Sequence, residues 1–332
     1  MKALRCNELG GPDRLSVENI PTPEIKSNEV LVAIRSASVN FPDVLMIQGL
    51  YQYQPPLPFT PGAEAAGTIE AIGLDVKNFK IGDRVFIMAG AGCFAEKIAV
   101  EETRIQPIPD GMDFDVAAAL AMTYGTSIYA LKQRANIQAG ETLLVMGASG
   151  GVGLSAVELG KAFGAKVIAA VSSEEKASVC KEHGADETII YPANGLDRDQ
   201  QKEFSNSIKN LTNGLGANVV YDPVGGSYAE PAIRATAWDG RYLVIGFAAG
   251  EIPKPPLNLA LLKNCQIVGV FWGAWTTMFP SENLVNFNEL FSLYKEKKIN
   301  PRITDRFNLD NAADAIAHLG NRKAVGKVLV DV

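Results

Sequence analysis

The chain has 332 residues, of which 47% are hydrophobic and 20% are charged. These proportions are typical of a globular protein long enough to form two hydrophobic cores, so we expect two domains. The chain has 31 basic and 37 acidic residues and a formal net charge of -6, which argues against a broad basic surface for nucleic acid.

The cysteines indicate a reducing compartment. Cys6, Cys93, Cys180 and Cys265 form no C-x-x-C pair, the spacing expected of a zinc ribbon or a dithiol redox site, so we interpret them as free thiols. The sequence has no apolar stretch of membrane-spanning length and no secretory signal at its start. We therefore expect a cytoplasmic protein without a membrane or nucleic-acid partner.

Up to about residue 120, short strands alternate with turns that contain proline and glycine. Examples of the predicted strands are Glu29–Ser36, Gly67–Ile72 and Arg84–Met88. The pattern predicts a mostly β domain over residues 1–121.

From Thr142 onward, apolar runs alternate with segments of helical length, which predicts βαβ units around a parallel sheet. Gly164 and Gly184 follow two of the helical segments, where a left-handed C-cap favours glycine. Six runs supply the strands of a complete doubly wound sheet: Thr142–Met146, Lys166–Val171, Thr188–Tyr191, Ala217–Tyr221, Arg241–Ile245 and Gln266–Phe271.

The C-terminal part is expected to rejoin the first domain. A helix is predicted from Glu282 to about Lys298, and Gly326–Val332 is predicted as a strand. Because the six-stranded sheet is already complete, that strand should pair in the first domain. The predicted boundaries are therefore 1–121 and 276–332 for the first domain and 122–275 for the second.

A glycine-rich turn joins a predicted strand to a predicted helix at residues 147–153, G-A-S-G-G-V-G. In this setting glycines let the backbone approach a pyrophosphate at a helix N-terminus. The first glycine of the G-x-G-x-x-G pattern is replaced by alanine, and an alternative interpretation is a tight turn without a ligand. We predict that the dinucleotide is bound by Ala148, Ser149, Gly150, Gly151, Val152 and Gly153.

The residues after the second strand of this sheet favour NADP over NAD. An NAD site has an acidic residue about 20 positions beyond the glycine motif, and Ser173 stands there. We assign nearby Glu175 to a capping box with Ser172, and Glu174 to the helix dipole. Ser172, Ser173 and Lys176 can then bind a 2′-phosphate, although Lys176 is equally explained as a solvated helix lysine.

Together these features resemble the medium-chain dehydrogenase/reductase superfamily, and within it the zinc-independent quinone oxidoreductases related to zeta-crystallin. The similarity covers essentially the whole chain and implies a GroES-like, mostly β catalytic domain beside a Rossmann domain. Glu158 stands where many members have glutamine. The segments that carry the resemblance are S-V-N-F-P-D (38–43), Q-G-L-Y (48–51), P-F-T-P-G-A-E (58–64), T-Y-G-T (123–126), A-S-G-G-V-G (148–153), D-P-V-G-G (222–226) and G-K-V-L (326–329).

The resemblance also argues against zinc. Zinc alcohol dehydrogenases of the superfamily have a cysteine at the position of Asn40 and a histidine at that of Ala63, and neither residue found here is a usual zinc ligand. His183 and His318 are interpreted as surface or packing residues. Without a Lewis acid to polarise an alcohol, we expect reduction of an electron-poor quinone or α,β-unsaturated ketone in preference to oxidation of an alcohol.

By resemblance, Asn40, Asp43 and Tyr51 form the catalytic site, with Asn40 and Tyr51 as neutral donors to the acceptor oxygen. Leu45 replaces a second tyrosine of some relatives, so we expect the proton to come from water. From the residues alone, Asn40 is equally a turn residue before Pro42, and Tyr51 a half-buried loop aromatic.

Further cofactor-binding residues are implied only by the resemblance. Thr126 would support the nicotinamide region, and Tyr191 and Arg322 would approach the 2′-phosphate. Phe247 and Trp272 lie in segments whose backbones pass the nicotinamide end in relatives.

We therefore expect an NADPH-dependent oxidoreductase that reduces a quinone or another conjugated carbonyl compound. An NADPH-dependent enoyl or alkenal reductase would use the same fold, and a catalytically idle NADPH-binding protein, as among lens crystallins, is an alternative of another class. Relatives pair through the last strand of the cofactor sheet, here Gln266–Phe271, so a homodimer is expected because an unpaired apolar edge strand is a liability.

Overall fold

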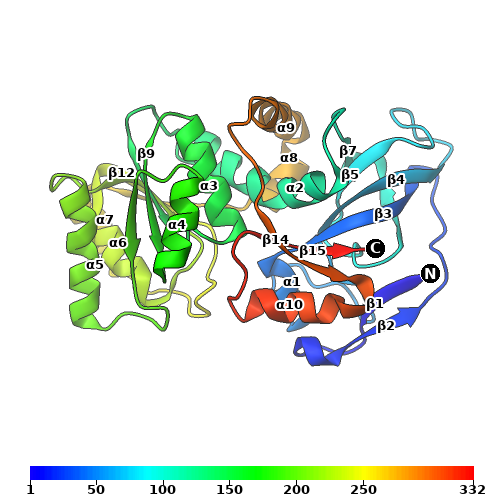
Figure 1. Ribbon diagram of the computed structural model, residues 1–332, viewed down its shortest axis with the longest axis horizontal. Helices are drawn as coiled ribbons and strands as arrows, with labels where there is room; N and C mark the ends of the chain where they lie inside the picture. Colours follow the sequence, from blue (N-terminus) through cyan, green and yellow to red (C-terminus); the bar gives the residue numbers. More distant parts are fainter. The chain divides into compact units, whose positions relative to one another are not determined.

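The computed structural model describes residues 1–332 and divides into two compact units (Figure 1). Unit 1 comprises Met1–Met122 and Pro301–Val332, and unit 2 comprises Thr123–Asn300. The first boundary falls within helix α2 (Phe114–Tyr129). None of the helices combines the length and the hydropathy needed to span a membrane.

The C-terminal boundary lies between residues 300 and 301, whereas the sequence analysis placed it between 275 and 276. Most of the intervening segment is α9 (Pro280–Lys295), which packs within unit 2. Asn283 of this helix accepts a hydrogen bond from the Trp272 indole at 3.2 Å, and the Phe287 ring meets the Trp272 ring edge-on. These contacts place the helix with the second unit.

Unit 1 is built on a seven-stranded sheet, as its predicted β character requires. The strands β14, β15, β3, β4, β5 and β7 lie in this order, and β6 also pairs with β3. The last strand, β15, pairs antiparallel with β3, which confirms that the chain returns to the first domain. The elements of unit 1 besides α2 are β1 (Lys2–Cys6), β2 (Leu15–Asn19), β3 (Glu29–Val39), α1 (Phe41–Ile47), β4 (Glu64–Ile72), β5 (Arg84–Met88), β6 (Lys97–Glu101), β7 (Ile105–Pro107), β14 (Ile303–Asn308), α10 (Ala312–Gly320) and β15 (Lys327–Asp331).

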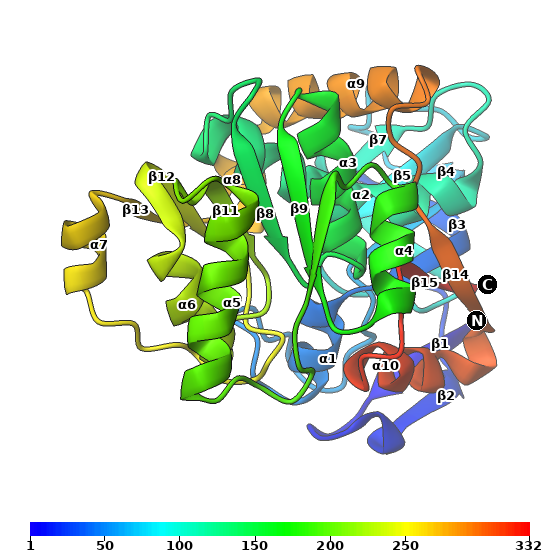
Figure 2. The same ribbon diagram turned by 60° about the vertical axis from the view of Figure 1, so that its left-hand side comes forward.

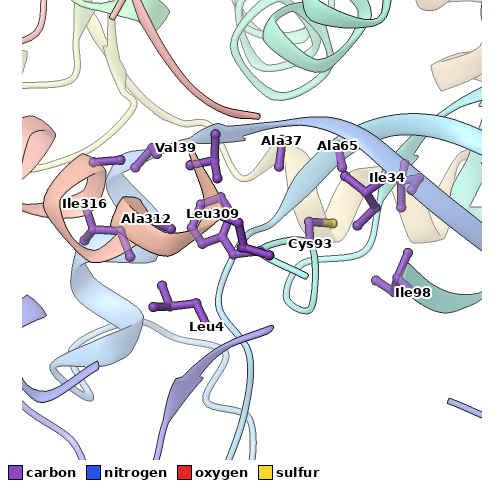
Figure 3. Packing of buried hydrophobic residues seen from close by; sticks show 14 of the residues in the cluster. Leu4, Ile34, Ala37, Val39, Ala65, Cys93, Ile98, Leu309, Ala312 and Ile316 are labelled. Carbon is purple, nitrogen blue, oxygen red and sulfur yellow. The ribbon is translucent and has the colours of Figure 1, made fainter. Parts of the chain in front are cut away.

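The core of unit 1 gathers along one face of β3 (Figure 3). Val30, Val32 and Ile34 alternate on this face, and after a register irregularity between residues 34 and 36 the pattern continues with Ala37 and Val39. The irregularity shifts the alternation by one residue, because side chains change face with every position along a strand. Beyond it, the residues before Asn40 lie in the fixed register that places the candidate catalytic residues.

Unit 2 contains six parallel strands in the order β10, β9, β8, β11, β12, β13 (Figure 2). This is the strand order of the doubly wound dinucleotide-binding fold, which confirms the prediction. Its elements are β8 (Thr142–Met146), α3 (Gly151–Ala162), β9 (Lys166–Val171), α4 (Glu174–Glu182), β10 (Glu187–Ile190), α5 (Arg198–Leu211), β11 (Ala217–Asp222), α6 (Ala229–Arg234), β12 (Thr236–Val244), α7 (Asn258–Lys263), β13 (Gln266–Gly269), α8 (Trp272–Met278) and α9.

Helices cover both faces of this sheet. Leu144 and Ile168 belong to the cluster that α5, α6 and α7 cover, and Figure 2 shows α5 and α6 side by side. Leu143 and Val167 point to the opposite face, where α3 packs. A Cβ atom on Gly160 of α3 would lie 2.6 Å from Leu143 and 3.1 Å from Val167, so this glycine permits the close approach of helix and sheet.

Candidate active site

The glycine turn lies at the carboxyl end of β8, beside the point where the strand order reverses between β8 and β11. Gly147 has a φ of +57°, a conformation that favours glycine. A Cβ atom on Gly153 would lie 2.4 Å from the Gly147 carbonyl oxygen and 2.7 Å from Ala148 Cα, so only glycine lets α3 approach the turn. A Cβ atom on Gly150 would meet nothing of the protein closer than 3.6 Å. The space beside Gly150 is open, as backbone contact with a ligand requires.

The first amides of α3 are free to bind an anion. Gly150 is the N-cap residue and supplies no side-chain cap. The Leu154 amide bonds the Gly150 carbonyl at 2.8 Å, but the amides of Gly151, Val152 and Gly153 find no acceptor in the protein. Three unsatisfied donors at the positive end of a helix dipole are suited to bind phosphate groups.

The turn is held against its neighbours by two small buried residues. Ala148 is fully buried, and its amide donates to the Ala170 carbonyl of β9 at 3.1 Å. Ser149 follows and is also buried. The start of the turn is therefore buried and hydrogen-bonded to β9.

A second group of donors follows β9, where the structure corrects one prediction. The N-cap of α4 is Ser173, whose hydroxyl accepts from the Lys176 amide at 3.3 Å, so the expected capping box of Ser172 and Glu175 is wrong. The helix begins one residue later than that box requires. Ser172 is therefore not the capping residue. Its hydroxyl accepts a hydrogen bond from the Lys176 ammonium at 3.3 Å. A hydroxyl and a cation lie side by side at this strand end, as a 2′-phosphate site needs.

The backbone of Tyr191 lies beside the end of β9, just before Ser172. Its amide donates to the Val171 carbonyl at 2.9 Å. Its ring, however, packs at 4.8 Å from the Tyr228 ring and 5.9 Å from the Phe204 ring, within the core under α5 and α6. The structure thus gives the Tyr191 ring a packing role.

Three further predicted residues of unit 2 are Thr126, Phe247 and Trp272. Thr126 is half-buried on α2, and the buried Trp272 ring lies against the neighbouring Gly125, where a Cβ atom would come within 2.4 Å of it. Phe247 follows β12, and its ring lies over Gly225. Phe247 therefore lies at the carboxyl end of the sheet, and Trp272 lies against the helix that carries Thr126.

Asp222 organises the loop beside the glycine turn, a role that the sequence analysis did not assign. Its carboxylate accepts from the amides of Val224 and Gly225 at 2.7 and 3.0 Å, and Tyr242 donates its hydroxyl to the second oxygen. Burial raises the pKa of Asp222. The Val224 side chain so placed lies 2.8 Å from where a Cβ atom on Gly147 would be. Asp222 thus fixes one wall of the glycine turn.

In unit 1, the strand registers bring charged residues to Asn40. Val328 of β15 pairs with Val39 of β3, so Lys327 lies across from Asn40, and Ser38 of β3 pairs with Glu64 of β4. The Lys327 ammonium lies 2.8 Å from Asn40 Oδ1 and 3.0 Å from Glu64 Oε1. Both Lys327 and Glu64 are buried, so the pair is a desolvated ion pair.

The Asn40 side chain is fully engaged within the protein. Its Oδ1 accepts from Lys327, and its Nδ2 donates to Glu64 Oε1 at 2.7 Å and to the Ser38 carbonyl at 3.3 Å. Because a carboxamide nitrogen carries two hydrogens, neither is left for a ligand. The geometry thus makes Asn40 part of a closed buried network.

Asp43 and Tyr51 differ sharply in their surroundings. Asp43 is fully buried and accepts from the amides of Asn40 and Gly62 at 2.8 and 3.2 Å. Burial raises its pKa to about 7, further raised by Glu64, and the backbone donors and Lys327 oppose this shift. Tyr51 is half-buried, burial raises its pKa, and its hydroxyl has no partner within the protein. Of the three predicted catalytic residues, only Tyr51 has a free donor.

Three residues of unit 1 remain to be compared with the sequence analysis: Arg322, which was predicted to bind the cofactor, and Lys327 and Glu64, which were given no role. Arg322 is exposed and has a φ of +58° in the turn before β15. Lys327 and Glu64 were quoted in the sequence motifs without a role. The signal that could have found Lys327 is a lone charge at the start of the apolar run K-V-L-V, since a charge in a buried strand requires a partner.

Comparisons with known proteins agree with this geometry. A family described as alcohol dehydrogenase GroES-like domain matches residues 26–110, and one described as zinc-binding dehydrogenase matches residues 151–286. The chain is 38% identical to a quinone oxidoreductase-like protein 2 homolog of Nematostella vectensis, over 99% of this chain and 88% of that protein. It is 34% identical to a quinone oxidoreductase of Pseudomonas aeruginosa, over 99% of both. The structure of the Escherichia coli quinone oxidoreductase complexed with NADPH matches all of both chains with a TM-score of 0.90 at 28% identity.

Proposed function

Because the chain belongs to the quinone oxidoreductases of the medium-chain dehydrogenase/reductase superfamily, we propose that it uses NADPH to reduce a quinone or another conjugated carbonyl compound without zinc. The observation that carries the proposal is the free helix N-terminus at Gly151, Val152 and Gly153, with open space beside Gly150. This arrangement fits a dinucleotide pyrophosphate.

The proposed cofactor site extends from the glycine turn to the end of β9. The amides of the turn would bind the pyrophosphate, and Ser172, Ser173 and Lys176 the 2′-phosphate. The pairing of the Ser172 hydroxyl with the Lys176 ammonium supports NADPH over NADH, because it offers a hydroxyl and a cation to a 2′-phosphate. The remaining residues of the proposed cofactor site are Thr126, Ala148, Ser149, Tyr191, Phe247, Trp272 and Arg322.

When bound, NADPH supplies the hydride for the acceptor carbon. We assign the stabilisation of the acceptor oxygen to Tyr51, because the residue is half-buried and its hydroxyl has no competing partner. Asn40 and Asp43 remain in the proposed site as the residues that shape it: Asp43 bonds the backbone on both sides, at Asn40 and Gly62. A neutral donor aimed at developing negative charge is the form of catalysis that such an acceptor needs.

The buried ammonium supports chemistry without zinc. Lys327 already provides a cation next to Asn40, at the position where zinc dehydrogenases of the superfamily have a cysteine ligand. A second cation beside Lys327 would be repelled in a site of low dielectric constant. An acceptor that is itself electron-poor is therefore favoured over an alcohol substrate.

We also propose that the protein forms a homodimer through β13. This strand is the last in the sheet order and pairs only with β12. Ile267 on it is 41% exposed, and Phe271 just beyond it is 56% exposed. An unpaired apolar edge of this kind is suited to pairing with the same edge of a second copy. Sedimentation of the wild type and of Ile267→Lys tests this, with a dimer expected only for the wild type.

The activity is tested by NADPH oxidation with a panel of ortho-quinones, enones, alkenals and enoyl-CoA esters, with and without a metal chelator. We expect the highest kcat/KM with an ortho-quinone and no effect of the chelator. Highest activity with enoyl esters or alkenals would replace the quinone assignment with a double-bond reductase. NADPH binding without turnover of any acceptor, or loss of turnover with the chelator, would contradict the proposal.

A further inference from the structure

Glu158 has three hydrogen-bond partners that lie far apart in the sequence. It is a buried residue of α3, the helix that starts at the glycine turn. Its Oε2 accepts from the Tyr124 hydroxyl at 2.5 Å and from the Asn300 amide at 2.9 Å. Its Oε1 lies 2.6 Å from Nδ1 of His183, the residue that caps the end of α4. One side chain thus joins α2, α3, α4 and the end of unit 2.

Two of these partners adjoin the places where the chain passes from one unit to the other. The chain crosses after Met122, just before Tyr124, and again at Asn300, the last residue of unit 2. We call these two crossings of the chain, at residues 122–124 and 300–301, the two passages. A residue at each passage therefore donates a hydrogen bond to the same oxygen atom of Glu158.

We propose that Glu158 is a positioning residue that couples the two passages between the units to each other and to the helix of the glycine turn. Its effect on turnover rests on the proposed function. Loss of these bonds would free the chain at both passages, and a change at such connecting residues is expected to lower kcat.

The chemistry of the network requires a hydrogen-bond acceptor at residue 158. The Tyr124 hydroxyl and the Asn300 amide both donate, and burial and the nearby carboxylate raise the pKa of Tyr124, which keeps its hydroxyl protonated. A carboxylate accepts all these bonds, and glutamine can keep those to Tyr124 and Asn300 through its carbonyl oxygen while its amide group faces His183. Leucine keeps the volume and loses every bond.

The test compares Glu158→Leu with Glu158→Gln as the matched control. Hydrogen exchange is followed at the Asn300 amide, which itself donates to Glu158, and at the α2 amides from residue 123 to 127. We expect exchange to accelerate by about tenfold or more at both places in Glu158→Leu, as for the loss of a buried charge-assisted hydrogen bond. Glu158→Gln should remain within about threefold of the wild type. If Glu158→Leu does not fold, Tyr124→Phe removes one bond at constant shape and should still accelerate exchange at Asn300.

Turnover provides the second readout. In Glu158→Leu, kcat should fall by about fivefold or more while the Kd for NADPH stays within about twofold of the wild type, and Glu158→Gln should behave as the wild type. The coupling is refuted if exchange accelerates at only one passage, if the glutamine variant behaves as the leucine variant, or if NADPH binding is lost instead of kcat. A wild type that reduces no quinone would refute the proposed function, and the exchange data would still decide the role of Glu158.

Discussion

The ammonium of Lys327 lies 2.8 Å from the side-chain oxygen of Asn40. The same ammonium neutralises the buried carboxylate of Glu64 at 3.0 Å. Removal of one partner of a buried ion pair leaves an uncompensated charge, which costs about 3–5 kcal/mol. Lys327→Met should therefore lower the free energy of unfolding by about this amount, measured by urea denaturation.

The exposed Lys323 is a matched control for that substitution. Lys323→Met should change the free energy of unfolding by less than about 0.5 kcal/mol, as surface substitutions do. A similar small effect for Lys327→Met would show that the buried pair is not needed to hold Asn40.

Lys176 is expected to discriminate between the two nicotinamide cofactors. Each charge-assisted hydrogen bond to the 2′-phosphate contributes about 1.5–3 kcal/mol, so Lys176→Ala should raise the KM for NADPH by roughly 10- to 100-fold and leave that for NADH unchanged. Steady-state kinetics with both cofactors check this, with Lys181→Ala at the exposed end of the same helix as the control. Equal use of the two cofactors before and after the substitution would show that Lys176 does not bind the 2′-phosphate.

Tyr51 is expected to act on the acceptor and not on the cofactor. Loss of a donor to developing negative charge lowers the rate by about 10- to 1,000-fold, so Tyr51→Phe should reduce kcat/KM for an ortho-quinone at unchanged NADPH affinity. Tyr53→Phe, two residues away with a side chain 54% exposed, is the matched control. A kcat/KM for Tyr51→Phe within twofold of the wild type would mean that another group stabilises the oxygen.

Asp43 should make stability depend on pH. Burial raises its pKa from 3.8 to about 7 in the folded protein, so the folded state holds the proton more tightly than the unfolded state. The stability that protonation of Asp43 contributes to the folded state is therefore complete below pH 3.8, and it is lost as the pH rises through about 7. Asp43→Asn cannot bind or release this proton.

The wild type should accordingly exceed Asp43→Asn in unfolding free energy by more at about pH 5 than at about pH 8. Urea denaturation of both proteins at the two pH values measures this difference, in which the other titrating groups cancel. A difference that is constant, or that grows with pH, would show that Asp43 is ionised throughout.

The sequence was informative wherever local pattern determines structure. The apolar runs before Gly147 and Ser172 predicted β8 and β9 with their observed bounds, because buried parallel strands are nearly continuous apolar segments. The start of β12 was missed by contrast. Asp239 has a φ of +58° and Gly240 follows it, so a sequence typical of a turn lies within the strand as an irregularity.

Side-chain networks could not be predicted in the same way. Lys327, Glu64 and Asn40 come together only through the registers of three strands, and the resemblance that named Asn40 did not show that its amide has no free hydrogen. Similarly, the choice of Ser173 over Ser172 as helix cap depends on a shift of one residue, which is within the usual uncertainty of helix ends.

NADPH titration of two variants tests directly whether the glycine turn binds the cofactor. A Cβ atom on Gly150 fits the protein but would occupy the open space beside the helix N-terminus, whereas one on Gly153 would clash with the Gly147 carbonyl at 2.4 Å. Gly150→Ala should therefore keep the wild-type melting temperature and lose NADPH affinity by about 100-fold or more, and Gly153→Ala should lose both. Gly273→Ala, where a Cβ atom meets nothing within 4 Å, should change neither. NADPH affinity of Gly150→Ala within about twofold of the wild type would show that the glycine turn does not bind the cofactor.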